Sequence, residues 1–138
     1  MVGIRAERRL FRVVVLIASL VPILAGAAGA LQGAAMIKGV DSAGPDLDSH
    51  FRYLSGLLLG VGIGFVFCTF DLQRRSPLFN ALGVIVIAGG LARLLGVALG
   101  GLPAAAHLFA LLMELLVVPG LLLWLRRIVQ FARQHPRG

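Results

Sequence analysis

The chain has 138 residues, of which 59% are hydrophobic and 14% charged, and its mean hydropathy is +0.95. A soluble domain of this size needs more polar side chains to cover its surface, so the composition excludes an ordinary soluble enzyme or binding module. The net charge of +7 is typical of proteins that bind nucleic acid. Here, however, the arginines gather beside apolar stretches and form no basic surface interleaved with aromatic residues, so we expect no nucleic-acid partner. The composition therefore predicts a protein of the lipid bilayer.

Four apolar stretches predict four membrane-spanning helices. Each is close to the roughly 20 residues that a spanning helix needs, and they cover about residues 13–36, 51–70, 78–99 and 104–125. We predict an all-α fold, in which residues 1–138 form a single integral membrane domain, an antiparallel four-helix bundle, with a basic tail at 126–138. The connection at 100–103 is long enough only for a tight turn, so the third and fourth spans should form a hairpin.

The distribution of charge predicts the orientation of these spans. Basic residues occur before the first span, between the second and third, and after the fourth: Arg5, Arg8, Arg9, Arg12, Arg74, Arg75, Arg126, Arg127, Arg133 and Arg137. The connection after the first span instead carries Asp41, Asp46 and Asp48 against Lys38, and the connection after the third carries no charge. Under the positive-inside rule, both termini are expected in the cytoplasm.

The basic tail has two interpretations. As an amphipathic segment, it would place Ile128, Val129 and Phe131 against lipid while Arg127 and Arg133 contact anionic headgroups. As a simple topological anchor, it would only fix the orientation of the fourth span, and this second interpretation is favoured.

The first apolar stretch also allows an alternative. Arg8 and Arg9, the run 13–24 and the small residues 28–30 resemble a secretory signal with a cleavage site. The apolar character continues as far as Ile37, which is longer than a usual signal core and favours a retained helix. Charge does not decide between the two, because both leave the other three spans in the same orientation.

Glycines predict how the spans contact one another, because helix association in a bilayer depends on close approach of the backbones. On the second and third spans they share a helix face with Arg52 and Arg93, respectively. The predicted helix-packing glycines are Gly56, Gly60 and Gly64 on the second span and Gly89, Gly90 and Gly96 on the third.

Polar residues inside the spans are the functional candidates, since a charge at the bilayer centre costs at least about 2.5 to 3.5 kcal/mol on insertion scales. With a rise of about 1.5 Å per residue, the axial offset between Arg93 and Glu114 is about 6 Å, which an arginine side chain can cover. We therefore predict that these two residues form an ion pair. The candidate polar intramembrane site comprises Gln32, Arg52, Arg93, His107 and Glu114.

Each of these residues also has a non-functional interpretation. Arg93 can extend along its own helix towards the membrane surface, Arg52 can pair with Asp48 four residues earlier, and His107 can cap a turn. An ion pair between Arg93 and Glu114 is compatible with either a structural role or a working site. Pro119 is expected to kink the fourth span and to loosen backbone hydrogen bonds close to Glu114.

No catalytic, metal-binding or cofactor-binding motif is evident. Cys68 is the single cysteine, so the chain can form no internal disulfide, and His50, His107 and His135 lack the spacing of a metal motif. The glycines form no phosphate-binding loop or dinucleotide fingerprint, and no nucleophile elbow occurs. We therefore expect no cofactor and no metal. Whether the protein is an enzyme stays open, although we expect that it is not one.

Several short segments resemble a known family. They are Asp48-Ser49-His50-Phe51-Arg52-Tyr53-Leu54-Ser55-Gly56, Gly89-Gly90-Leu91-Ala92-Arg93, and Gly101-Leu102-Pro103 together with Glu114. The chain is similar, from its first helix through Trp124, to the bacterial membrane family called domain of unknown function 4345, which resembles DoxX-like four-helix proteins. This resemblance implies a multi-pass protein of the bacterial cytoplasmic (inner) membrane with a recurring polar set at Arg52, Arg93 and Glu114.

The resemblance supplies no activity, and one position departs from it. Gly96 stands where many relatives have a serine or another small polar residue, so any polar contact that such a residue makes is not expected here.

Three functional hypotheses follow. The favoured one is a non-enzymatic protein that uses an outward-facing Arg/Glu pocket to bind a lipid-like or quinone-like ligand, or a membrane protein partner. The second is a proton-coupled small transporter with Glu114 as the exchanging carboxyl group. The absence of internal repeats and of a second deep carboxylate counts against it. The third is an intramembrane enzyme in which Glu114 and His107 move protons on a lipid-soluble substrate.

Overall fold

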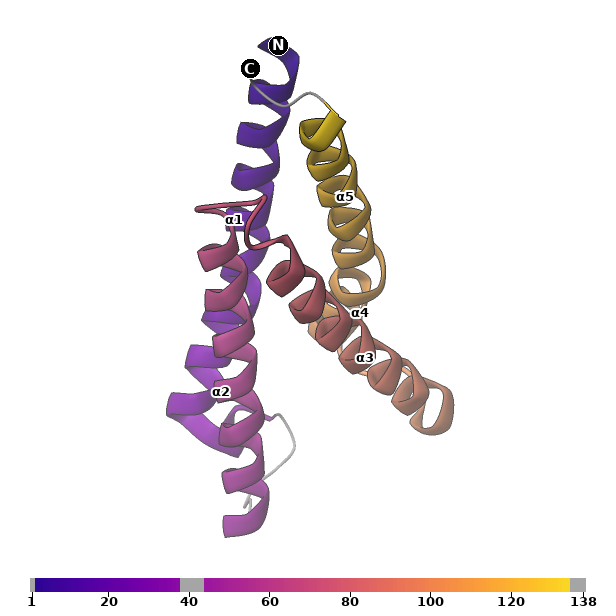
Figure 1. Ribbon diagram of the computed structural model, residues 1–138. Helices are drawn as coiled ribbons and strands as arrows, with labels where there is room; N and C mark the ends of the chain where they lie inside the picture. Colours follow the sequence, from indigo (N-terminus) through magenta and orange to yellow (C-terminus); the bar gives the residue numbers. More distant parts are fainter. Residues whose placement is uncertain (1, 38–43, 135–138) are drawn as a thin grey trace. The chain divides into compact units, whose positions relative to one another are not determined.

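The computed structural model describes residues 2–37 and 44–134, and these residues form helices and no strands (Figure 1). The elements in chain order are α1 (Val2–Gln32), the 3₁₀ turn η1 (Gly33–Met36), α2 (Pro45–Cys68), α3 (Ser76–Gly100), α4 (Ala105–Leu112), the π-helical turn η2 (Met113–Val117) and α5 (Val118–Gln134). Four residues used in the sequence predictions, Lys38, Asp41, His135 and Arg137, lie outside the described residues.

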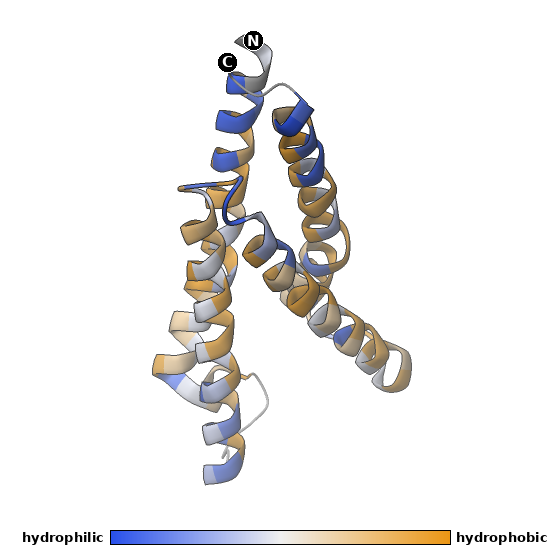
Figure 2. Ribbon diagram, in the orientation of Figure 1, coloured by the Kyte–Doolittle hydropathy of each residue, from blue (hydrophilic) through white to orange (hydrophobic). Residues whose placement is uncertain are grey.

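The described helices provide four segments that are long and apolar enough to cross a membrane. They are Arg5–Met36, Pro45–Cys68, Ser76–Gly100 and Ala105–Gln134, the last of which combines α4, η2 and α5. Figure 2 shows apolar residues along most of each segment. Polar residues gather in the first turns of α1, in the connection between α2 and α3, and in the last turns of α5. The chain is therefore a multi-pass membrane protein with an all-α fold.

The helices are longer than the apolar stretches that predicted them. Helix α1 begins at Val2 rather than near residue 13, and α2 begins at Pro45 rather than near residue 51. The helix that ends in α5 continues to Gln134, nine residues beyond the predicted 125. Hydropathy marks only the apolar part of a helix, whereas backbone hydrogen bonds continue into the polar ends. Pro45 is well suited to a first helical position, because its missing N–H has no helical partner there.

Two glycines with positive φ follow the ends of helices. Gly33 (φ 68°) comes directly after α1, and Gly101 (φ 89°) directly after α3. Side chains other than glycine rarely adopt this left-handed conformation, which commonly terminates an α-helix. Gly101 begins the short turn 101–104 between α3 and α4, as predicted for the hairpin.

The chain divides into two compact units, which are described separately. Unit 1 comprises Met1–Arg12 and Asp71–Gly138, and unit 2 comprises Val13–Phe70. Helix α1 therefore contributes its first turns to unit 1 and the rest of its length to unit 2.

In unit 2, small residues allow α1 and α2 to approach closely. A Cβ atom added to Gly26 would lie 2.5 Å from the backbone nitrogen of Leu59, and one added to Gly62 would lie 2.7 Å from Cγ1 of Ile23. Gly29 lies directly against Ser55. Larger side chains at these positions would push the two helices apart, so the three glycines fix this contact.

In unit 1, aromatic rings join three helices. Phe11 of α1 contacts Phe79 of α3 with ring centroids 5.7 Å apart, and it contacts Trp124 of α5 edge-on with centroids 5.2 Å apart. Phe11 and Phe79 are fully buried. The indole Nε1 of Trp124 donates a hydrogen bond of 3.0 Å to Oε1 of Glu7. These contacts hold the first turns of α1 against α3 and α5.

Two interpretations of the sequence are corrected by this packing. Ile128 and Val129 would face lipid in the less favoured, amphipathic interpretation of the tail, but both are buried, because α5 continues as a regular helix and keeps its apolar face inside unit 1. Among the predicted packing glycines, Gly90 is buried, whereas a Cβ atom added to any of four others would meet nothing within 4 Å: Gly56, Gly60, Gly89 and Gly96. Those four are not packing glycines within their own units. Regular spacing beside an arginine predicts a common helix face, but not which neighbour that face contacts.

Candidate functional site

A charged cluster joins α3 to the segment that contains η2. Arg93 lies on α3, and Glu114 is the second residue of η2. The guanidinium donates from Nε to Oε2 of Glu114 at 3.0 Å and from Nη2 to Oε1 at 3.1 Å. This is the two-pronged geometry in which an arginine matches a carboxylate best. The predicted ion pair between Arg93 and Glu114 is confirmed.

His107 of α4 joins the same cluster. Its Nδ1 lies 3.1 Å from Nη1 of Arg93. A guanidinium can only donate hydrogen bonds, so Nδ1 must be the acceptor, and the imidazole then carries its proton on Nε2. The contact thus fixes the tautomer of His107 and leaves an Nε2–H group as a further donor.

The three side chains differ in their access to the surroundings. The Glu114 side chain is 16% exposed and the Arg93 side chain 33% exposed, while His107 is an exposed residue. The carboxylate is therefore the covered part of the cluster, and the imidazole is its open part. Arg93 uses one N–H of Nη1 and one of Nη2 within the cluster, so each of these nitrogens keeps a second N–H.

The position of Glu114 depends on an irregular turn. Pro119 has no backbone N–H, so the carbonyl of Leu115, four residues earlier, cannot receive its usual helical hydrogen bond. In η2 the N–H of Val118 donates to the carbonyl of Met113, which is the wider spacing of a π-helix. This confirms the expectation that Pro119 loosens the backbone near Glu114.

Gly90 makes room for this turn against α3. It lies about one helical turn before Arg93 on the same helix. A Cβ atom at Gly90 would lie 2.8 Å from Cβ of Glu114 and 2.8 Å from Cδ2 of Leu115. The absence of a side chain at this position therefore brings η2 close enough for the carboxylate to meet the arginine.

Arg52 has a different set of partners, all within unit 2. Its Nε donates to Oδ2 of Asp48 at 2.7 Å, and its Nη1 donates to the carbonyls of Ala30 and Leu31 at 2.8 and 2.9 Å. Those carbonyls belong to the last turn of α1, where helical partners are missing. Asp48 also accepts a hydrogen bond of 2.9 Å from the backbone N–H of Ala34. The alternative in which Arg52 pairs with Asp48 is confirmed, and the pair ties the end of α1 to the start of α2.

The structure thus assembles three of the five predicted site residues in unit 1: Arg93, His107 and Glu114. Arg52 belongs to unit 2, as does Gln32, which is exposed at the end of α1. A single pocket that contains all five stays a prediction. No group of three or more described His, Cys, Asp and Glu residues is arranged to hold a metal ion.

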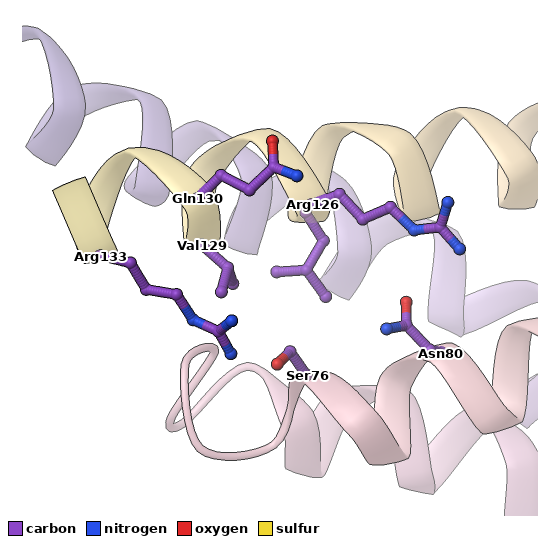
Figure 3. Close-up of a pocket in the computed structure, with 7 residues that line it drawn as sticks. Ser76, Asn80, Arg126, Val129, Gln130 and Arg133 are labelled. Atoms are coloured by element: carbon purple, nitrogen blue, oxygen red, sulfur yellow. The ribbon is translucent and has the colours of Figure 1, made fainter.

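Unit 1 also contains a cavity that the sequence analysis did not identify (Figure 3). It has a volume of about 380 Å³ and lies between the start of α3 and the end of α5. Its lining residues are Ser76, Asn80, Leu125, Arg126, Val129, Gln130 and Arg133. The predicted hairpin could have indicated this cavity, because two antiparallel spans place the start of the third span opposite the end of the fourth.

Comparison with known families gives a match over residues 10–125 to the family described as Domain of unknown function (DUF4345). The chain belongs to this family. The match includes α2 and α3 and reaches into α5, so Arg52, Arg93, His107 and Glu114 all lie within it. No curated protein and no solved structure matches the chain. Because the family description carries no activity, function has to be inferred from the geometry of the site.

Proposed function

We propose that this protein is non-enzymatic and binds a lipid-soluble molecule through the cluster of Arg93, His107 and Glu114. The observation that carries the proposal is the outward set of donors: the Nε2–H of His107 and the remaining N–H groups of Arg93. Such donors bind an acceptor oxygen, as found in the carbonyl of a quinone-like ring or an ester.

The charge of the cluster selects among acceptors. Glu114 neutralises the guanidinium through two hydrogen bonds, and the imidazole that accepts from Arg93 adds no charge. A site without net charge gives little Coulomb attraction to an anion, but it still offers directed hydrogen bonds to a neutral oxygen. This balance favours an uncharged, quinone-like ligand over an anionic one.

The same pair disfavours proton-coupled transport. In each cycle, protonation of Glu114 would have to disrupt two charge-assisted hydrogen bonds to Arg93, which are stronger than neutral ones. Binding requires no such disruption, because the donors directed at the ligand are those that the pair leaves unused.

We place the protein in the bacterial cytoplasmic membrane, with the cluster towards the outer side. The support comes from unit 1, in which the basic first turns of α1 contact α5 through Glu7, Trp124 and Arg127. The start of α3, which follows the basic connection 71–75, lies opposite the end of α5 across the cavity. The three basic segments therefore share one end of unit 1, as the positive-inside rule requires of cytoplasmic segments.

The binding proposal can be tested with two matched probes in protein reconstituted into lipid nanodiscs. One probe is a benzoquinone with a decyl chain, and the other is the corresponding decylbenzene, which has no acceptor oxygen. We expect the quinone to bind more tightly by about tenfold, the effect of a hydrogen bond worth about 1.4 kcal/mol. Equal affinity for both probes would contradict the proposal.

Two histidine variants test the site itself. His107→Phe removes the Nε2–H donor and leaves the pair of Arg93 and Glu114 intact, so it should reduce quinone affinity by a similar factor. His50→Phe changes an exposed histidine in α2 and serves as the control, for which we expect no change. An unchanged affinity in His107→Phe would place the ligand elsewhere.

A further inference from the structure

The cavity between α3 and α5 is chemically different from the Arg93 cluster, because its charged residues are both cations. In Figure 3, Ser76 and Asn80 extend from α3, while Arg126 and Arg133 extend from α5 on the opposite side. Ser76 and Asn80 are one turn apart, and the two arginines are about two turns apart, so each pair occupies one helix face. Val129 supplies apolar lining between them.

Neither arginine of the cavity forms an ion pair with a described residue, whereas the described carboxylates of unit 1 have other partners. Glu7 accepts from Trp124 and lies 3.7 Å from Arg127. Asp71 accepts from the backbone N–H of Arg74, and Glu114 pairs with Arg93. The cavity therefore has an uncompensated positive charge, and the start of α3 adds the positive end of a long helix dipole.

An acceptor in the same cavity is also unsatisfied. Oδ1 of Asn80 is buried and has no hydrogen-bond partner. The hydroxyl of Ser76 donates to the carbonyl of Gln73 at 3.0 Å, which leaves the lone pairs of its oxygen available. Buried acceptors usually have a donor, so the lining suits a ligand that contributes one.

We propose that this cavity binds a phosphate group carried by a molecule that also has a hydroxyl or ammonium donor. Arg126 and Arg133 bind the phosphate oxygens, and Asn80 accepts from the donor. The cavity's volume of about 380 Å³ is within the range of small-ligand sites. A phospholipid headgroup such as glycerol phosphate has this chemistry, and so does the free glycerol phosphate ion.

Native mass spectrometry of the whole protein, released from bilayers with equal amounts of phosphatidylglycerol and phosphatidylmethanol, tests the proposal. Both lipids carry one negative charge, but only the first has headgroup hydroxyls. We expect phosphatidylglycerol to be retained with about tenfold preference. Absence of any preference would overturn the role of the donor.

Variants distinguish binding in this cavity from attraction of the lipid by surface charge in general. Arg126→Gln and Arg133→Gln should each reduce lipid retention about tenfold, whereas Arg127→Gln, which changes the adjacent exposed arginine, should leave it unchanged. Asn80→Leu should abolish the preference while retention of phosphatidylmethanol persists. Equal losses in Arg126→Gln and Arg127→Gln would overturn the proposal.

Competition distinguishes the two sources of the phosphate. Retention that persists in an excess of soluble glycerol phosphate identifies the lipid headgroup as the ligand. Displacement of the lipid by the soluble ion, with direct binding of that ion that Arg126→Gln abolishes, identifies the free ion. Arg126→Lys preserves the charge and should retain binding in either case, so its loss would contradict a phosphate site.

Discussion

Arg93 and Glu114 occupy the apolar parts of spanning segments, where a single charge is costly. Together they neutralise each other through two hydrogen bonds, and Glu114 is the more covered partner. Removing one partner leaves the other without a counter-charge, whereas removing both leaves an apolar contact. The pair should therefore behave as one energetic unit.

A double-mutant cycle measures this coupling. We expect Arg93→Leu and Glu114→Leu each to lower the free energy of unfolding by about 1 to 3 kcal/mol, because each leaves an unpaired polar group. The double variant should lose less than the sum of the two by at least about 1 kcal/mol. Denaturant unfolding in detergent micelles provides the measurement, and strictly additive losses would show that the two residues act independently.

Sequence was informative about side chains whose partners follow from charge and depth. Arg93 and Glu114 were paired by their opposite charges and small axial offset. The contacts of Arg52 with the carbonyls of Ala30 and Leu31 were not predictable in this way, because they depend on where α1 ends. That end is set by the backbone conformation at Gly33, which hydropathy does not report.

At the scale of elements, the contact between α3 and η2 determines the geometry of the Arg93 cluster. The π-helical turn offsets the backbone at Glu114, and the absence of a side chain at Gly90 allows that segment to lie close to α3. Pro119 is the physical cause of this turn, because it lacks the backbone N–H that would otherwise bond to the carbonyl of Leu115.

Two neighbouring glycines give a matched test of this contact. Gly90→Ala places a methyl group 2.8 Å from Cβ of Glu114 and should lower the free energy of unfolding by about 1 to 3 kcal/mol. Gly89→Ala meets no atom within 4 Å and should raise it by about 0.5 to 1 kcal/mol through helix propensity. Thermal unfolding followed by circular dichroism compares the two, and equal effects would indicate that α3 and η2 are not in close contact.

The type and order of the helices were predictable from the sequence. The residues at which each helix begins and ends, and the faces by which the helices pack, were less predictable. The four apolar stretches correspond to the four spanning segments, and the short turn before α4 was expected from its length. The amphipathic alternative for the tail placed Ile128 and Val129 against lipid, whereas the tail continues the helix of the fourth span and buries both residues. The arginine-lined cavity was not predictable from hydropathy, because most of its polar lining residues lie at or beyond the ends of the predicted spans.

At the scale of the whole molecule, the positive-inside proposal predicts which connections face the cytoplasm. Gln73→Cys and Leu102→Cys place thiols at exposed positions in two connections, and the native Cys68 is buried and should stay unlabelled. In bacterial spheroplasts, an impermeant maleimide should label the second variant but not the first. In inside-out vesicles the pattern should reverse. Labelling of Gln73→Cys in spheroplasts would refute the proposed orientation.

Helix α1 belongs to both units, and this has a consequence for the order of synthesis. Phe11 precedes by many residues the rings that it contacts, Phe79 and Trp124, so those rings are translated much later. The α1 and α2 hairpin of unit 2 can assemble as soon as its own residues leave the ribosome. Unit 1 cannot be completed until α5 has emerged and packed around residues that were made earlier.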